Sequence, residues 1–174
     1  MNYREEMLRT LSPKGDLYEH ALYGLVTEAA EALDTLKKVK FYGQEFDKVH
    51  ALEELGDIRW YVELAYVAFD LETKDWRVLD EHYSHYDYGA SVRFIVYQSA
   101  HIMEECYEGN NALYALQSIL DFLNNAAECL GYTMEDVESA NIAKLKKRYP
   151  EKWTEDKAMN RDLEAERKEL DENS

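Results

Sequence analysis

The chain has 174 residues, of which 46% are apolar, and a formal net charge of −16. This length and apolar content suffice for one domain with a hydrophobic core, while the negative charge disfavours binding to a nucleic-acid polymer, which needs a basic surface. No apolar run reaches the ~18 residues of a membrane span, and the N-terminal MNYREEMLRT lacks the apolar region of a signal peptide. Because Cys106 and Cys129 are too few for a disulfide framework, we expect a cytoplasmic protein with no membrane partner.

Helical periodicity dominates the sequence, which has only 7 glycines and 2 prolines. After a polar, loop-like segment over residues 1–16, helices are predicted over about 17–39, 47–72, 88–108 and 111–130, and from residue 133 to a stop at Pro150. Asp47 is a predicted N-cap, and Thr133 and Asp136 form a predicted capping box. These features predict an all-α bundle of about five helices, with the apolar stretch IRWYVELAYVAF at its centre.

The domain is predicted to span residues 1–150, with a core at 17–72 and 132–150 and a helical hairpin at 73–131 that is either an insertion or a degenerate repeat. Residues 22–33 can be laid beside 96–107, and 53–65 beside 117–129, as in a duplicated hairpin. Chance similarity between amphipathic hairpins is the alternative. A short helix is expected at 75–82. Residues 151–174 are expected to form a charged tail, either as a helix along the surface or partly disordered.

Two pairs of carboxylates lie on consecutive predicted helices. Glu28 and Glu31 are three residues apart, and Glu54 and Asp57 repeat this spacing. Each pair lies on one helix face within the apolar stripe, and helices joined by a short loop pack antiparallel, so the pairs can face each other. Four dry, unpaired carboxylates would repel by several kcal/mol. Although one such pair alone is more typical of a solvated helix face, the two together predict a divalent cation, most naturally Mg²⁺.

Two glycines lie a turn or less from these acids. Gly24 precedes the first pair, and Gly56 lies inside the second. Because glycine has no side chain, both positions would let a backbone or a ligand approach closely.

The segments around the acids resemble a known family. E-x-x-E, 22 intervening residues and E-x-x-D, together with EELGDIRWYVELA, are similar to the signature of the all-α nucleoside triphosphate pyrophosphatases, the MazG-like superfamily. YTMEDVESANIAKLKKRYPEKW (132–153) resembles the closing helix of such proteins. The resemblance covers about 17–69 and 132–153. It implies Mg²⁺-dependent hydrolysis, with Mn²⁺ as a substitute metal, of a nucleoside or deoxynucleoside triphosphate to the monophosphate and pyrophosphate.

The resemblance also implies roles for the acids. Glu28, Glu31, Glu54 and Asp57 would bind the metal. Glu28 is our choice for the carboxylate that orients or deprotonates the attacking water. Neighbouring Glu53 is expected to face solvent.

Basic residues near the closing helix are candidates for phosphate contacts. Lys144 and Arg148 are one turn apart and match the family's basic pair, so they would contact the β- and γ-phosphates. Asn141 lies on the same face and would hydrogen-bond the ligand or cap locally. The alternative is a helix end whose cations complement the helix dipole. The lysines at 37, 38 and 40 are either further phosphate contacts or a solvated helix end.

Three aromatic or imidazole side chains are candidates for substrate contacts. His20 precedes the first acidic pair on about the same face, and Trp60 and Tyr61 follow Asp57 directly. One of the two aromatic residues is expected to face the nucleobase. A surface histidine and core aromatic residues are the alternatives.

Compact members of the family pair their subunits, so a homodimer or higher homo-oligomer is expected. The extra residues, about 70–131, would instead supply within one chain what a second subunit supplies elsewhere. We expect one site per chain, because His101 and Ser118, which align with Glu28 and Glu54, cannot replace carboxylates as Mg²⁺ ligands.

Other functions stay open on the sequence alone. A di-iron bundle would need two E-x-x-H motifs, whereas His101 and Glu104 stand in the reverse order and Asp47 and His50 match weakly. The histidines at 82 and 85 have a spacing that can bind zinc, but a solvated linker also fits them. A non-catalytic helical adaptor or nucleotide-binding protein is the remaining alternative.

Overall fold

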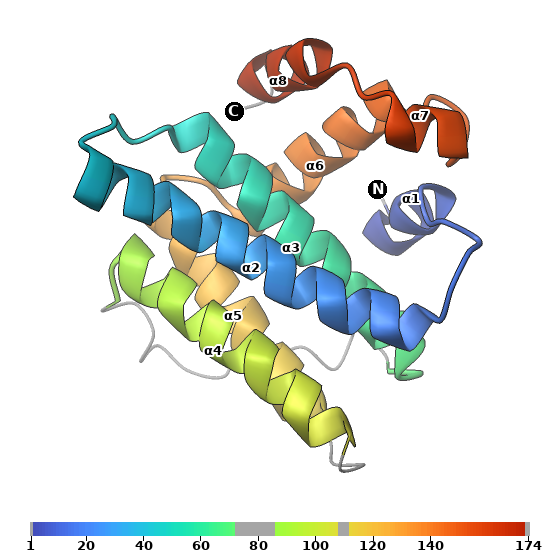
Figure 1. Cartoon of the computed structure of the whole chain (residues 1–174), viewed down its shortest axis with the longest axis horizontal. Coiled ribbons are helices and arrows are strands. Elements are labelled where there is room, and N and C mark those ends of the chain that lie inside the picture. Colours follow the sequence, from blue (N-terminus) through green and yellow to red (C-terminus); the bar gives the residue numbers. More distant parts are fainter. Residues whose placement is uncertain (1, 72–85, 108–111, 173–174) are drawn as a thin grey trace.

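A computed structural model describes residues 2–71, 86–107 and 112–172 of the chain. In these ranges the regular structure is entirely helical, with eight helices and no strand (Figure 1). The all-α prediction is therefore confirmed. The helices are α1 (Tyr3–Arg9), α2 (Leu17–Tyr42), α3 (Lys48–Ala68), α4 (Tyr88–Tyr107), α5 (Leu113–Cys129), α6 (Met134–Arg148), α7 (Glu155–Met159) and α8 (Leu163–Glu172).

The five predicted helices correspond to α2–α6, although α2 runs on to Tyr42, past its predicted end near residue 39. Asp16 caps α2 by accepting from two backbone N–H groups, and Gly43 ends it at φ 66°, a left-handed conformation that favours glycine. Asp47 caps α3, and the Thr133–Asp136 capping box begins α6. The prediction was wrong at the end of α3, which stops at Ala68 rather than near residue 72. The short helix expected at 75–82 lies outside the described residues.

Two helical hairpins build the centre of the molecule. The α2–α3 hairpin packs against the α4–α5 hairpin through α2 with α4 and α3 with α5 (Figure 1). As predicted, α3 is central: its residues are buried on most faces, including Leu55, Ile58 and Leu64, which are fully buried. Two packed hairpins are expected from a duplicated hairpin, but an unrelated four-helix bundle has the same arrangement. The duplication therefore stays a prediction.

The helix α1 was not predicted, whereas a surface helix was one of the two predictions for the C-terminal segment. α1 lies where the sequence indicated only a polar loop; it packs against α3 and α6, and its Met7 is fully buried. The charged C-terminal segment forms α7 and α8, and α8 packs on α6 with Leu170 buried (Figure 1). Both chain ends therefore cover the face formed by α3 and α6.

A helix that crosses a membrane needs about 20 mostly apolar residues, and the rule can be applied to the described helices. None of them is long and apolar enough to cross a bilayer.

Candidate functional site

A cavity of about 290 Å³ lies where α2 and α3 meet α1, α6 and the C-terminal segment. It brings together seven of the ten site residues predicted from the sequence, whose side chains are carboxylate, aromatic, imidazole or guanidinium. They are His20, Glu28, Glu31, Asp57, Trp60, Tyr61 and Arg148. The remaining three do not line the cavity but lie next to these residues: Glu54 groups with Glu28 and Asp57, and Asn141 and Lys144 donate hydrogen bonds to Asp57.

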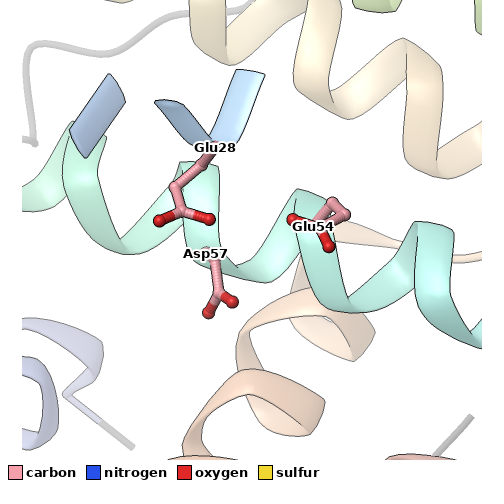
Figure 2. Close-up of side chains that lie close together, drawn as sticks. All are labelled: Glu28, Glu54 and Asp57. Carbon is pink, nitrogen blue, oxygen red and sulfur yellow. The ribbon is translucent and has the colours of Figure 1, made fainter. Parts of the chain in front are cut away.

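Three of the four predicted metal ligands converge. Glu28, Glu54 and Asp57 each offer a carboxylate oxygen, and these oxygens lie within 4.8 Å of one another. Figure 2 shows Glu28 extending from α2 toward α3, which carries the other two acids. The three-residue spacing on α3 places both acids on one face of that helix, as the sequence predicts. The arrangement concentrates negative charge between two packed helices.

Glu54 is the most deeply buried of the three acids. Its residue is 3% exposed, and its Oε2 has no hydrogen-bond partner among the described residues. Its other oxygen, Oε1, lies 3.4 Å from His50 Nδ1. Burial and, to a smaller extent, the charges of Asp57, Glu31 and Glu28 together raise the pKa of Glu54 to about 9. A buried carboxylate with an unpartnered oxygen is costly unless a proton or a cation accompanies it.

Glu28 is half-buried and faces the cavity. Burial raises its pKa to about 7, and the neighbouring charges of Asp57 and Glu31 act in the same direction. Glu28 therefore exchanges its proton near neutral pH when no cation is present.

Asp57, in contrast, is held by two donors from α6. The Asn141 amide donates to Oδ1 over 2.9 Å, and Lys144 Nζ lies 2.7 and 2.6 Å from the two carboxylate oxygens. The Tyr3 hydroxyl donates to Asn141 Oδ1 over 3.0 Å and so fixes the amide. Gly56 makes this contact between α3 and α6 feasible, because a Cβ there would lie 2.9 Å from the Asn141 side chain.

These contacts change the interpretation of Lys144 and Glu53. The sequence suggested a phosphate contact for Lys144, but its fully buried ammonium is engaged by Asp57 and, over 3.3 Å, by Glu53 Oε1. The expectation that Glu53 faces solvent was wrong, since its side chain is only 19% exposed. Burial alone would raise the pKa of Glu53, but its hydrogen bond with His50 and the charge of Lys144 outweigh burial and lower the pKa to about 2.

Glu31 also differs from expectation. It was predicted to point inward beside Glu28, but it is exposed and lines the edge of the cavity. Residues three apart on a helix differ by about 60° in direction, and on α2 this difference leaves Glu31 at the cavity edge while Glu28 faces the acids of α3. Glu31 stays outside the group of three converging oxygens.

An aromatic cluster forms another part of the cavity wall. The His20 ring lies 5.9 Å from Trp60 and 5.5 Å from Tyr61, between centroids. Trp60 is 8% exposed and donates its indole N–H to Thr10 Oγ1 over 3.1 Å. Tyr61 lies across the missing side chain of Gly24, where a Cβ would come within 1.9 Å of the ring. The predicted close approach at Gly24 is thus made by this tyrosine.

Arg148 reaches the cavity from the end of α6, next to residues that were not predicted as part of the site. The guanidinium forms a two-pronged ion pair with Glu166 of α8, through Nε and Nη2. Arg161 and Trp153 from the C-terminal segment line the same cavity. Trp153 was quoted only as the last residue of the segment that resembles the closing helix, and only the charge of the C-terminal segment pointed to Arg161. The lysines 37 and 38, offered as further phosphate contacts, pair with Asp34 on their own helix.

The rival metal motifs do not assemble in the described ranges. The group that could hold an ion there contains three carboxylates and no histidine. His101 stacks on Tyr97 at 6.0 Å on α4, and Glu104 is exposed. Ser118 accepts a hydrogen bond from Gln98 over 3.1 Å. The histidines at 82 and 85 lie outside the described residues.

Comparison of the chain with protein-family models, curated proteins and solved structures gave no match. The family resemblance therefore stays a prediction, and the function has to be argued from the cavity and its side chains.

Proposed function

We propose that the protein is a Mg²⁺-dependent nucleoside triphosphate pyrophosphohydrolase. The observation that carries the proposal is the unpartnered, buried Oε2 of Glu54, within a group of three carboxylates at a cavity that also offers aromatic rings and arginines. Such a cavity combines the three kinds of contact that a nucleotide needs: a place for a cation beside its phosphates, a flat apolar surface for its base, and cationic side chains.

The residues present fit a magnesium ion. Magnesium prefers oxygen ligands at 2.0–2.1 Å in octahedral geometry, so that opposite ligands lie about 4 Å apart. The three converging oxygens, within 4.8 Å of one another, approach that span. A cation there would also relieve the repulsion that raises the pKa values of Glu28 and Glu54. Manganese takes similar oxygen ligands and is expected to substitute.

The side chains around the group divide the remaining work. Lys144 and Asn141 hold Asp57 in one orientation, so that its carboxylate does not reorganise when a substrate arrives. Glu28 lines the cavity directly, so we assign to it the orientation of the attacking water and the acceptance of its proton. When bound, the metal supplies positive charge against the charge of the phosphates. Water attacks the α-phosphorus, and pyrophosphate leaves.

The other walls of the cavity are assigned to the rest of the nucleotide. Trp60, Tyr61 and His20 offer flat faces for stacking on the base. Arg148 offers guanidinium donors for the phosphate chain. One chain supplies all of these groups, so the proposed site does not need a residue from a second subunit.

The test is pyrophosphate release from a panel of ribo- and deoxynucleoside triphosphates with Mg²⁺. Wild type is compared with Glu54→Gln, which keeps the shape of the side chain and removes its charge. Glu63→Gln is the matched control, because Glu63 is an equally buried glutamate on α3, 1% exposed, but is paired with Arg4 and Arg59 away from the carboxylate group.

We expect wild type to release pyrophosphate from at least one triphosphate. Glu54→Gln should lose this activity by about 10²–10³-fold, as for the loss of one charge-stabilising group in an active site, and Glu63→Gln should keep it. The proposal is wrong if no triphosphate is cleaved, if the products are diphosphate and inorganic phosphate, or if Glu54→Gln is as active as wild type.

A further inference from the structure

The C-terminal segment brings a buried carboxylate beneath two arginines. Glu166 on α8 is 2% exposed. It accepts hydrogen bonds from Arg148 at both Oε1 and Oε2. Its Oε2 also accepts one from Arg161 over 2.9 Å. One carboxylate thus holds two guanidinium groups, and the trio keeps a net positive charge. Arg148 belongs to α6, whereas Arg161 immediately precedes α8, so the ion pairs join two elements at one place.

Both arginines line the cavity that holds the carboxylate group. They also line a neighbouring cavity of about 170 Å³, where Lys147 and Lys157 are further wall residues. Four cationic side chains therefore gather at this end, in a chain whose net charge is −16. The cavity is polarised, with carboxylates on α2 and α3 and guanidinium groups from α6 and the C-terminal segment.

The two guanidinium groups keep donors that Glu166 does not use. Arg148 engages Glu166 through Nε and Nη2, and Arg161 engages it through Nη2. Each guanidinium carries five N–H donors in a fixed plane. In the described part of the chain no other hydrogen bond is made by Arg148 Nη1 or by the remaining nitrogens of Arg161. These donors are available to an anion in the cavity.

We propose that Arg161, together with Arg148, binds the phosphates of the substrate beyond the scissile bond, and that Glu166 is the positioning residue that holds both guanidinium groups at the cavity. This inference rests on the proposed function for the identity of the substrate. It makes the segment from residue 154 to 172 part of the active site rather than a charged tail. The recognised chemistry is a polyphosphate chain of at least two linked phosphates.

The probe is inorganic tripolyphosphate, titrated by calorimetry into the full chain in the presence of Mg²⁺. Arg161→Ala is compared with Arg167→Ala, a closely matched control: both arginine side chains are 39% exposed and paired with an acid, but Arg167 pairs with Asp47 outside the cavity. Loss of a charge-assisted contact predicts an affinity about 10–100-fold weaker for Arg161→Ala. Arg167→Ala should bind as wild type does.

Glu166→Gln tests the positioning role, with folding checked by circular dichroism and Glu166→Asp as the conservative variant. Tripolyphosphate affinity should fall in Glu166→Gln and recover in part in Glu166→Asp, while Mg²⁺ binding without phosphate stays unchanged in both. A merely structural role would weaken both ligands together and would overturn the assignment of Glu166.

The inference is overturned if wild type does not bind tripolyphosphate, if Arg161→Ala binds it as tightly as wild type, or if Arg167→Ala loses as much affinity. Turnover is scored separately. Binding that depends on Arg161 without hydrolysis of any nucleotide would support this inference and overturn the proposed function. Hydrolysis of a nucleotide that does not change in Arg161→Ala would support the proposed function and overturn this inference.

Discussion

Replacing Glu54 by glutamine is expected to stabilise the protein when no metal is present at pH 7.5. The pKa of this carboxyl is raised to about 9 in the folded chain, first by burial and then by the neighbouring acids. The folded state therefore keeps a proton that the unfolded state has lost above its ordinary pKa of 4.5. It follows that the contribution of Glu54 to stability falls as the pH rises from about 4.5 toward 9.

The size of the effect follows from the same shift. At pH 7.5 the solution is three pH units above the ordinary pKa of a glutamate. At ~1.4 kcal/mol per unit, keeping Glu54 buried then lowers the free energy of unfolding by at most about 4 kcal/mol. Part of this loss arises from repulsion by the neighbouring carboxylates, and the contributions of such coupled groups are not additive. We therefore expect Glu54→Gln to raise the free energy of unfolding by about 1–4 kcal/mol. At ~2–4 °C per kcal/mol for a chain of this size, the melting temperature should rise by several degrees.

Chemical denaturation in EDTA, at pH 5.0 and pH 7.5, measures this difference. Glu63→Gln is again the matched control. Its carboxylate lies 2.5 Å from Arg4 Nε and 2.8 Å from Arg59 Nη1, so its replacement should lower the free energy of unfolding by about 1–3 kcal/mol. The same substitution on the same helix should thus have opposite signs, and the gain for Glu54→Gln should shrink at pH 5.0.

Magnesium completes the test. Wild type should gain stability as Mg²⁺ is added, because a ligand that binds only the folded state stabilises it, whereas Glu54→Gln should gain far less. The reasoning is refuted if Glu54→Gln is destabilised at pH 7.5 without metal, or if Mg²⁺ does not distinguish the two proteins.

Three further predictions concern other parts of the site. Mg²⁺ binding at pH 7 should release between one and two protons, because Glu28 and Glu54, with pKa values of about 7 and 9, must ionise to bind; calorimetry in buffers of different ionisation enthalpy measures this, and no proton release would contradict it. Lys144→Met should cost about 3–5 kcal/mol by leaving Asp57 without its buried partner, and added Mg²⁺ should restore part of that loss in denaturation curves; an equal loss with and without Mg²⁺ would count against the site. Gly24→Ala should lower the melting temperature despite the better helix propensity of alanine, because its Cβ would lie 1.9 Å from a tyrosine ring carbon; an unchanged or higher melting temperature would show that the ring moves aside at no cost.

The helices and the acidic group could be predicted because local signals encode them. The predicted caps at Asp47 and Thr133 satisfy backbone groups within a few residues, and apolar periodicity marks the buried faces. Spacing alone also placed Glu54 and Asp57 on one face of α3. These features need no knowledge of the rest of the chain.

The other parts of the site depend on contacts between distant residues. Lys144 binds Asp57, 87 residues away, and nothing near it distinguishes that partner from a phosphate. Glu166 gathers Arg148 and Arg161 only because α8 packs on α6. α1 has seven residues, too few to be stable alone, and depends on the burial of Met7. The three-residue spacing predicted that Glu31 points inward, but spacing alone does not fix the direction of a side chain relative to a neighbouring helix.

The most direct test of the central claim is hydrolysis of the preferred triphosphate in ¹⁸O-labelled water with Mg²⁺, followed by mass spectrometry of both products. The label should enter the nucleoside monophosphate and the pyrophosphate should stay unlabelled, because water is proposed to attack the α-phosphorus beside Glu28, Glu54 and Asp57. Label in the pyrophosphate, or no labelled product with any nucleotide, would contradict it.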